Sequence, residues 1–387
     1  MRILHTVAGL WEGTGGPVAS ITSLCAGLAA RGHDVTLLTG SGRLHPAVAE
    51  LQPRVRVRTE SLGPYAAGNW SRPFREACSA EARLADVVHD HGVWLHTNWS
   101  SVRMAVRAQR PVIRSPRGML SPWARRRSRL LKRLLWTLIE RRLFDETTLV
   151  HLTSELEERD VRDLGVTSPT VVIPNGIDLE RELDATRIAA ARAVGLPEAG
   201  GRRVVLFLSR IHPKKGLDLL CRVWADLPAQ TPALLLVAGM GDDASVGKLR
   251  RWIAEQPGPP ARYLGAVAGQ RKLELLSSAW ILALSSYSEN YGMVVGEALA
   301  CGTPVVTTVE MPWEETKAAG CGWVVAPRTD TLAQALREAL ALPCAEHESM
   351  RVKARSLVAR FHSLEGAVAR MEERYRSIRL PPGPNRG

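Results

Sequence analysis

Short runs of apolar residues alternate with amphipathic segments along most of the chain. Runs of this kind, bounded by Gly, Pro or Asp, are typical of strands buried on both faces of a parallel sheet, and the segments between them fit crossover helices. In the first half we expect strands near residues 2–8, 34–39, 54–58, 86–90, 111–115, 148–152 and 170–173. We expect helices there near residues 17–31, 73–84, 98–109, 121–142 and 154–164.

The same pattern restarts after a turn at 174–178 and a polar, Ala- and Arg-rich stretch that reaches Gly201. Strands are expected near 204–208, 233–238, 262–264, 280–284, 304–307 and 322–325, with helices near 216–226, 245–256, 270–277, 292–301 and 330–341. A final helix is expected near 363–378. Two successive α/β units predict two Rossmann-like domains that face each other across a cleft, with the hinge within 174–200.

Length and composition agree with this division. The chain has 387 residues, of which 45% are hydrophobic, so two domains of ordinary size can each bury a core. No apolar run is long enough to span a membrane, and the first residues fit a strand better than a signal peptide. The six cysteines (25, 78, 221, 301, 321 and 344) include no Cys-x-x-Cys pair. This spacing favours neither a zinc site nor a disulfide framework, and we expect a cytoplasmic protein.

Positive charge is concentrated in the first half. The net charge is +12, and residues 1–175 hold 24 Lys and Arg against 16 Asp and Glu. Basic proteins bind nucleic acid, anionic lipid or phosphorylated small molecules. Because the sequence has no zinc finger, no aromatic RNA-binding strand and no helix-turn-helix, we expect no nucleic-acid partner.

The most informative motif spans residues 288–304 and places two carboxylates around a helix start. Glu289 precedes Gly292, Glu297 lies in the helix, and Gly302 with Pro304 ends it. The free amides of a helix N-terminus suit a phosphate, and the two carboxylates can accept hydrogen bonds from hydroxyl groups on either side of it. A nucleotide sugar has this layout, although two merely solvated glutamates would give the same spacing.

A basic loop follows the first strand of the second half. Arg210, Lys214, Lys215 and Gly216 lie where the carboxyl end of a parallel strand would bind a ligand, and their charges can neutralise a diphosphate. A solvated surface loop is the alternative explanation.

In the first half, three loops after strands carry candidate binding groups. Gly15 and Gly16 form a glycine turn that allows close approach to a phosphate. His89 and His91 form a His-x-His pair, which lacks an evident third ligand for a metal site. Arg117 follows the strand near 111–115 and can bind an acceptor phosphate or the donor, or it points outward from a structural turn.

The segment 125–142 carries eight basic residues and one acid. Its apolar residues, Leu130, Leu131, Leu134, Leu135, Leu138 and Ile139, form a stripe at helical spacing. Two explanations remain open: a buried helix with a solvated basic face, and a helix that rests on an anionic membrane near a lipid-linked acceptor.

Taken in order, these motifs resemble those of the retaining GT-B glycosyltransferases of family 4. The family pattern has a Gly-Gly loop, His-x-His, an Asn-Gly-Ile-Asp turn, Arg-x-x-x-x-Lys-Gly, and two glutamates separated by seven residues. Arg210 and Lys215-Gly216, and Glu289 and Glu297, match the last two elements. Tyr291 replaces the usual Phe and Asn290 the usual Gly; neither change removes a carboxylate.

The resemblance implies a role for each matching residue. Arg210 and Lys215 would stabilise the departing nucleoside diphosphate, Glu289 would hold a hydroxyl of the transferred sugar, and His91 would orient that sugar from the first domain. Further donor contacts are implied for Gly15, Gly16, Gly265, Asn290, Tyr291, Gly292, Met293, Val294 and Glu297, the last on the ribose. Arg117 is the acceptor-side candidate, and His89 is expected to be structural.

The resemblance also implies the organisation of the chain and its biological setting. Residues 1–175 would bind the acceptor, 176–362 the nucleotide sugar, and 363–387 would form a helix that returns to the first domain. The sequence segments around Arg117 and His91 resemble those of a subgroup that builds bacterial surface polysaccharides and lipopolysaccharide. The implied reaction moves a hexose to a lipid-linked glycan acceptor at the inner face of the plasma membrane, whereas a soluble small-molecule acceptor is the alternative.

No metal or other cofactor is expected. Asp242-Asp243 is a poor match to the Asp-x-Asp of metal-dependent glycosyltransferases, and cations with a helix N-terminus can replace the metal electrostatically. Two rivals come from other classes. An NAD-dependent Rossmann enzyme is disfavoured because the first loop lacks Gly-x-Gly-x-x-Gly. A catalytically silent GT-B scaffold is disfavoured by the intact Arg210, Lys215, Glu289 and Glu297.

Overall fold

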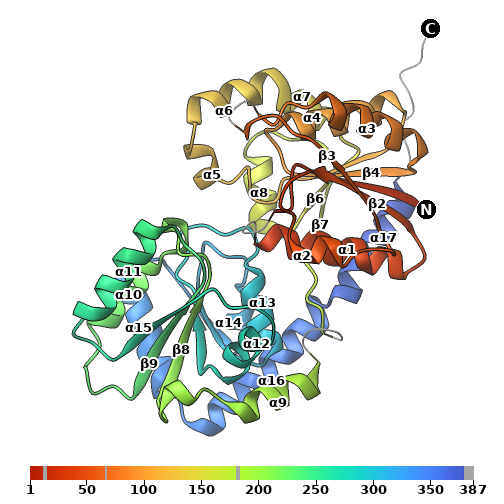
Figure 1. The fold of residues 1–387 in the computed structure, drawn as a ribbon. Helices are drawn as coiled ribbons and strands as arrows, with labels where there is room; N and C mark the ends of the chain where they lie inside the picture. The colour runs from red at the N-terminus through yellow and green to blue at the C-terminus, as the bar shows by residue number, and fades with distance from the viewer. Residues whose placement is uncertain (12–14, 66–67, 180–183, 379–387) are drawn as a thin grey trace. The chain divides into compact units, whose positions relative to one another are not determined.

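The chain folds into two α/β units, each built on one parallel sheet. The computed structural model describes residues 1–11, 15–65, 68–179 and 184–378. One unit comprises Met1–Gly176 together with the chain from Leu364, and the other comprises Ile177–Ser363 (Figure 1). The chain therefore passes between the units twice, and the last helix belongs to the first unit.

The first unit contains a seven-stranded parallel sheet in the order β3-β2-β1-β4-β5-β6-β7. Its strands are β1 (Arg2–Val7), β2 (Asp34–Gly40), β3 (Arg56–Glu60), β4 (Val87–His91), β5 (Val112–Ser115), β6 (Leu149–Leu152) and β7 (Thr170–Val172). Its helical segments are α1 (Gly16–Ala30), α2 (Pro46–Ala49), α3 (Arg72–Leu84), α4 (His96–Arg107), α5 (Pro122–Arg126), α6 (Arg129–Leu135), the π-helical turn η2 (Trp136–Glu140), α7 (Arg141–Asp145), α8 (Glu155–Arg162) and α17 (Leu364–Ser377).

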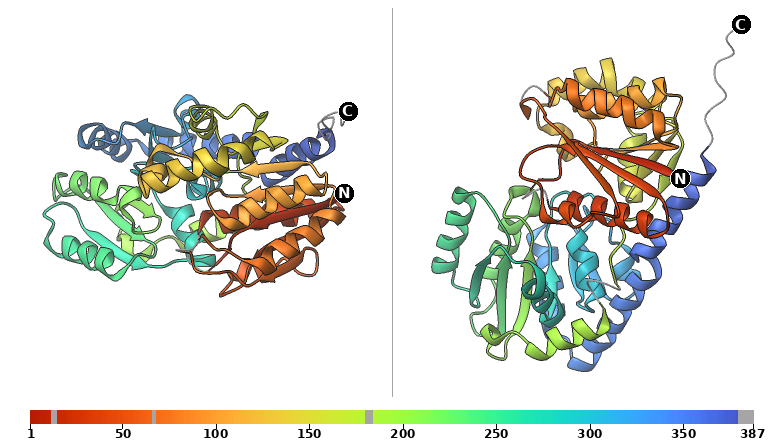
Figure 2. Two further views of the ribbon diagram at one scale, coloured as in Figure 1. Left: turned by 90° about the horizontal axis from the view of Figure 1, so that it is seen from above. Right: turned by 45° about the vertical axis from the view of Figure 1, so that its right-hand side comes forward.

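Alternate residues of β1 and β4 pack into different cores on the two faces of this sheet. Ile3 and Val87 pack with the apolar residues of α1 and α17, whereas their neighbours Leu4 and Val88 pack with those of α3 and α4. Helix α17 packs against α1 (Figures 1 and 2). Val368 of α17 approaches Gly27 so closely that a Cβ there would stand 2.5 Å from a Val368 methyl carbon.

The expected helix at 121–142 is wrong as a single element. Arg127 leaves the helical conformation, Ser128 adopts the left-handed one with φ 57°, and the chain restarts as α6 before continuing through η2 and α7. In one continuous helix, Arg125 and Arg126 would lie beside Arg129, four and three residues further on, and these like charges oppose such a helix. Because of this break, the basic side chains point in several directions and do not share one face of a single helix.

The second unit contains a six-stranded parallel sheet in the order β10-β9-β8-β11-β12-β13. Its strands are β8 (Arg203–Leu208), β9 (Ala233–Ala238), β10 (Ala261–Gly265), β11 (Ile281–Ala283), β12 (Val305–Thr308) and β13 (Gly322–Val325). Its helical segments are α9 (Ala185–Val194), η3 (Pro197–Ala199), η4 (Pro213–Lys215), α10 (Leu217–Ala225), α11 (Asp243–Glu255), α12 (Gly269–Ser278), α13 (Met293–Ala300), α14 (Glu315–Ala318), α15 (Thr329–Ala341) and α16 (Cys344–Phe361).

In both sheets the strand order reverses between the first and the fourth strand of the unit. Such a reversal leaves a crevice at the carboxyl ends of the two strands, because their connections run to opposite sides. In the first unit this point lies between β1 and β4, and in the second between β8 and β11. Gly15, Gly16 and His91 lie at the first of these points, and Arg210, Lys215 and Glu289 lie at the second. No helix of the described residues is long and apolar enough to cross a membrane.

Candidate active site

In the second unit, the loops after β8 and β11 bring the basic loop and the first glutamate together. Arg210 follows β8 by two residues, and Lys215 ends the turn η4. Gly216 has φ 64°, and a Cβ there would lie 1.9 Å from the carbonyl oxygen of Ser285, so only glycine allows this approach. The Ser285 hydroxyl also donates to the Gly216 carbonyl at 2.6 Å. These contacts fix the basic turn against the end of β11.

Lys215 and Glu289 form an ion pair at this junction, 74 residues apart in sequence. Burial raises the pKa of Glu289, but Lys215, with Lys214, outweighs burial and holds the pKa below its usual value. Glu289 is therefore ionised at neutral pH and can only accept hydrogen bonds. Burial, together with Lys215 and Arg210, lowers the pKa of Lys214. Two lysines act on the Glu289 carboxylate and Arg210 acts on Lys214, so the loop keeps positive charge for an anionic ligand.

Helix α13 begins directly beside this pair. Gly292 is its N-cap with φ 79° and ψ 62°, and a Cβ there would lie 2.7 Å from the methyl carbon of Met311. The first-turn amides, including those of Met293 and Val294, have no partner within the helix and carry its positive partial charge. Tyr291 is buried, and its hydroxyl bonds His362 Nδ1 at 2.8 Å, so this side chain anchors the loop; a donor contact there would use its backbone.

Glu297 lies one helical turn further along α13 and pairs with Lys272 of α12, with 2.7 Å between Oε2 and Nζ. Lys272 belongs to none of the motifs, so nothing in the sequence indicated that it pairs with Glu297. Gly265, expected near the base, ends β10, and its carbonyl accepts from the Gly239 amide at 2.7 Å. Both glutamates expected to hold hydroxyl groups are thus half-buried and each is paired with a lysine.

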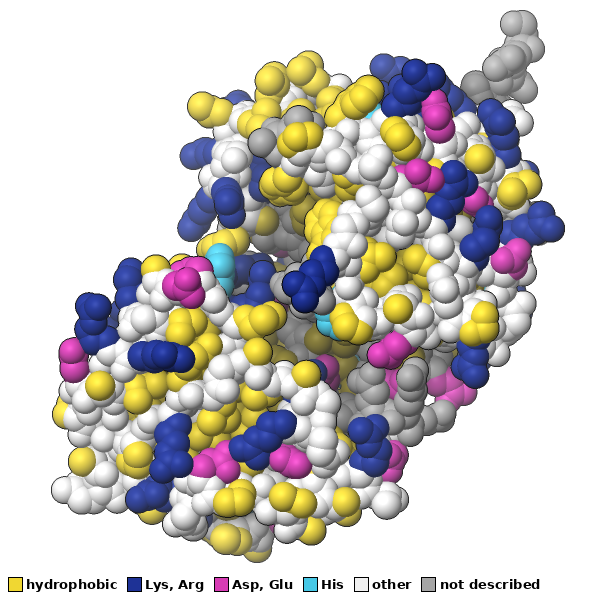
Figure 3. Space-filling model, viewed as in Figure 1, with side chains coloured by type: hydrophobic (Ala, Val, Ile, Leu, Met, Phe, Trp, Pro, Cys, Tyr) yellow, Lys and Arg dark blue, Asp and Glu magenta, His cyan; other side chains and the backbone are white. Residues whose placement is uncertain are grey.

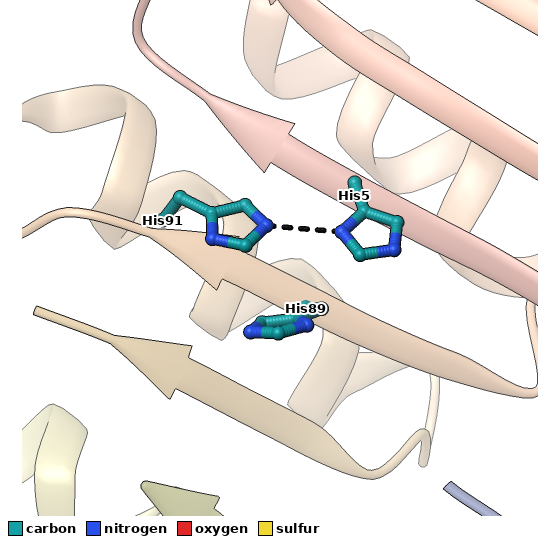
Figure 4. Close-up of side chains that lie close together, drawn as sticks. All are labelled: His5, His89 and His91. Carbon is teal, nitrogen blue, oxygen red and sulfur yellow. Dashed lines mark hydrogen bonds between the residues drawn. The ribbon is translucent and has the colours of Figure 1, made fainter. Parts of the chain in front are cut away.

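In the first unit, four buried histidines gather where β1 and β4 lie side by side. His5 is paired with His89 in the strand register, and His91 follows at the end of β4 (Figure 4). His5 Nδ1 and His91 Nε2 are 2.9 Å apart. His151 of β6 joins through Ser115. The pattern of His-x-His alone gave no sign of His5 or His151.

The partners of these rings settle where their protons lie. Arg117 Nη2 lies 3.1 Å from His91 Nδ1 and can only donate, so His91 carries its proton on Nε2 and donates to His5. His5 then carries its proton on Nε2, a buried atom without a hydrogen-bond partner among the described residues.

A second chain of hydrogen bonds runs from α17 to β7. His151 Nε2 lies 3.0 Å from the Ile173 carbonyl and must donate to it, so Ser115 donates to His151 Nδ1 at 2.8 Å. His89 Nε2 donates to Ser115 at 2.7 Å, and the Tyr375 hydroxyl donates to His89 Nδ1 at 2.7 Å. The structural role expected for His89 agrees with these bonds.

His5, His89 and His91 offer three nitrogens within 4.8 Å of one another, so the structure supplies the third histidine that the sequence did not reveal. The donor set does not suit a metal ion in this arrangement. Both nitrogens of His89 are hydrogen bonded, and the Arg117 guanidinium adds positive charge beside His91. A cation here would have to break these bonds and overcome that repulsion.

Arg117 is held beside His91 by a short turn with left-handed backbone, φ 55°. Its Nη1 donates to Asn175 Oδ1 at 2.8 Å. The next amide, of Gly118, donates to Glu157 Oε1 at 2.6 Å, and Glu157 also accepts from Thr153. The Ser-x-x-Glu spacing of 154–157, which resembles a helix-capping box, could have indicated this buried carboxylate.

Gly15 and Gly16 open α1, with Gly15 as its N-cap at φ 72° and both residues exposed. They follow β1, so they lie at the same carboxyl edge of the sheet as His91. Residues 12–14 of the glycine turn lie outside the described residues.

The buried histidines predict that the first unit loses stability in mild acid. Burial, with the charge of Arg117, lowers the pKa of His5 and of His151 to about 3, and lowers the pKa values of His89 and His91 well below normal. Below about pH 6.5 the unfolded chain gains protons that the folded unit cannot take. Each histidine then removes up to about 1.4 kcal/mol per pH unit.

Three carboxyls act in the opposite direction, because burial raises the pKa of Asp90 to about 7, the pKa of Asp160 to about 6, and the pKa of Glu157 above its usual value. The four histidines outnumber them, so the net effect of acid is a loss of stability. The urea midpoint of the first unit can be followed by hydrogen exchange of β1 and β4. We expect a lower urea concentration at the midpoint at pH 5.5 than at pH 7.5. H151N should show a shallower dependence on pH. An equal midpoint at both pH values would contradict neutral buried histidines.

The segment 125–142 exposes four of its leucines, whereas Leu135 and Ile139 are half-buried. The exposed fractions of Leu130, Leu131, Leu134 and Leu138 are 83%, 56%, 55% and 64%. Of the two explanations left open by the sequence, the buried helix with a solvated basic face is therefore wrong for these leucines.

Comparison with known proteins identifies the family. A model described as Glycosyl transferases group 1 matches residues 193–357, and one described as Glycosyl transferase 4-like domain matches residues 15–176. The D-inositol 3-phosphate glycosyltransferase of Nocardiopsis dassonvillei is 31% identical over 78% of this chain and 76% of that protein. The chain belongs to the group 1 glycosyltransferases. A Mycobacterium tuberculosis glycosyltransferase with the same description is 30% identical over 72% of this chain and 61% of its own length.

Solved structures agree with this glycosyltransferase assignment at the level of the fold. Anabaena HepE, determined in complex with UDP and glucose, superposes with a TM-score of 0.76 at 19% identity, over 97% of this chain and 100% of HepE. WaaG, described as a glycosyltransferase of lipopolysaccharide biosynthesis, gives a TM-score of 0.69 at 16% identity, over 97% and 100% of the two chains. The predicted GT-B fold and glycosyltransferase class are confirmed.

Proposed function

We propose that this glycosyltransferase moves a hexose from a nucleotide sugar to an acceptor hydroxyl and retains the configuration of the anomeric carbon. The bond between that carbon and the diphosphate breaks, the new glycosidic bond forms on the same face, and the acceptor proton passes to a phosphate oxygen. Arg210 and Lys215 stabilise the leaving diphosphate, Glu289 accepts from a sugar hydroxyl, and Glu297 accepts from the ribose. The loop from Asn290 to Val294 holds the sugar and phosphate through its backbone, and the base lies near Gly265.

The observation that carries this proposal is the pairing of Lys215 with an ionised Glu289 at the start of α13. A cation for phosphate, a carboxylate for hydroxyl groups and a helix N-terminus converge there on one strand edge. Since Glu289 stays ionised, it does not serve as a general acid, and the two-carboxylate mechanism of glycosidases does not apply.

For the acceptor, we favour a lipid-linked glycan of a cell-surface polysaccharide, met at a membrane by the segment 125–142. The exposed leucines among arginines support this choice. A phosphorylated small molecule is the second candidate, because the curated relatives are described as D-inositol 3-phosphate glycosyltransferases. In the first unit, His91, Arg117, Gly15 and Gly16 remain the candidates for contact with the reacting groups, since Arg117 already lies against His91.

The decisive experiment incubates the protein with a panel of nucleotide sugars, with and without acceptor, and follows release of the nucleoside diphosphate. We expect one donor to be consumed and the product to keep the anomeric configuration of that donor, as seen by proton NMR. An inverted product, or no turnover with any donor or acceptor, would overturn the proposal.

The same assay in EDTA tests whether a metal is needed. We expect unchanged turnover, because Arg210, Lys214, Lys215 and the α13 N-terminus supply the positive charge that a metal provides elsewhere. Complete loss in EDTA with recovery in Mn²⁺ would reject this mechanism while leaving the enzyme class intact.

A further inference from the structure

A pocket of about 480 Å³ lies in the first unit where α5, α6 and η2 meet the loop after β4. Five cationic side chains line it: Arg125, Arg126, Arg129, Lys132 and Arg133. The break at Ser128 makes this possible, because it turns α5 and α6 toward a shared space instead of stacking their charges along one helix.

Ion pairs among the described residues do not balance the positive charge of this pocket. Within the described parts of the chain, no carboxylate forms an ion pair with any of the five cations. Arg125 Nε is buried without a hydrogen-bond acceptor. The charge of Arg125 favours the ionised form of Asp160, but burial outweighs it and raises the pKa of that carboxyl to about 6. Clustered guanidinium groups of this kind match the several oxygens of a phosphate.

Two tryptophans form the walls of the pocket. Trp94 and Trp136 have ring centroids 6.3 Å apart, and Lys132 Nζ lies 5.8 Å from the Trp94 ring. Trp94 is fixed, because its backbone amide donates to Glu140 and its indole donates to the Met119 carbonyl. It follows His91 by three residues, so the pocket adjoins the carboxyl edge of the first sheet. Indole rings favour the boundary between polar and apolar surroundings.

Next to the pocket, the exposed leucines 130, 131, 134 and 138 project from α6 and η2. In Figure 3 hydrophobic and cationic side chains lie together over α5 and α6. A phosphate-binding pocket alone would not require an apolar surface beside it. An amphiphile in a membrane offers both chemistries at once, a phosphate at the surface and acyl chains below it.

We propose that this pocket binds the phosphate head group of a membrane amphiphile while the leucine surface of α6 enters the bilayer. The proposal deepens the proposed function, because it rests on an acceptor met at a membrane and names the site of contact. The preferred head group carries a terminal phosphate, since a monoester or diphosphate exposes more oxygens to the arginines than a diester does.

Binding to vesicles tests this directly. The probes are phosphatidylcholine vesicles containing either phosphatidic acid, a phosphate monoester, or phosphatidylglycerol, a diester, adjusted to equal surface charge. We expect the protein to bind the monoester vesicles about tenfold more tightly. R126S/R129S should abolish this preference. The matched control R127S/R141S removes the same charge from exposed residues outside the pocket and should keep it.

L130S/L134S should weaken binding to both kinds of vesicle, because the leucines contact acyl chains and not the head group. Thermal unfolding of each variant checks that it is folded. Two results would overturn the proposed head-group pocket. One is equal binding to monoester and diester vesicles of the same surface charge, and the other is an equal loss of the monoester preference in R126S/R129S and R127S/R141S. Nucleoside diphosphate release in solution needs no vesicle. If release fails while vesicle binding is intact, the proposed function is rejected and the pocket proposal is not.

Discussion

Replacing Lys215 by alanine should lower kcat for sugar transfer about 100- to 1,000-fold, with a smaller change in KM. The charge of Lys215 is needed most in the transition state. Negative charge on the diphosphate grows as the bond to the sugar breaks, so a fixed cation stabilises the transition state more than the bound donor. Lys215 is held in place by Glu289 and by the close approach of Gly216 to Ser285. It needs no rearrangement when the charge develops.

Steady-state kinetics with the donor found in the nucleotide-sugar panel provide the measurement. K215R keeps the charge but changes the geometry at Glu289, so it should retain part of the activity. K248A, which removes an exposed lysine of α11, should behave like the unmodified protein. Unchanged kcat in K215A would show that the basic turn does not serve the leaving group.

Replacing Glu140 by alanine should destabilise the first unit by about 3–5 kcal/mol. Glu140 is fully buried and accepts from the Trp94 amide and the Trp99 indole at 2.6 and 2.8 Å. Its other oxygen pairs with the fully buried Arg114 at 2.8 Å. The substitution would leave a guanidinium and two N–H groups without these acceptors inside the protein.

Urea unfolding of the first unit measures this effect. E146A is the matched control, because Glu146 forms a surface ion pair with Arg142 and should cost less than about 1 kcal/mol. E140Q, which keeps an acceptor but not the charge, should lie between the two. Similar midpoints for E140A and E146A would mean that the buried pair contributes little to stability.

The sequence predicted most of the fold because buried parallel strands leave short, plainly bounded apolar runs. Helices with weak patterns were harder to find. The expected list omitted α16, whose buried surface includes His347 and Arg351 beside Ala354 and Leu357, so polar and apolar positions do not alternate as in an amphipathic helix. The stretch described as polar and Ala- and Arg-rich contains α9, which buries only Ile188 and Ala191.

The sequence indicated a contact only where both of its residues belong to the family motifs. Arg210, Lys215 and Glu289 belong to one family pattern, and the structure brings Lys215 and Glu289 together. Lys272 and His5 lie in a helix and a strand that would look the same without them, so only the packing shows that they contact Glu297 and His91. Such contacts depend on strand register and helix placement, which sequence spacing does not specify.

The double passage of the chain between the units has a consequence for how the protein is made. The first unit is not complete until α17 has been synthesised, because Val368 and Tyr375 pack on α1 and β4. The second unit, residues 177–363, lies entirely before that helix. On the ribosome, the nascent first unit must therefore wait with the α1 surface uncovered while the whole second unit emerges and folds. Truncation before residue 364 would leave that surface permanently open to aggregation.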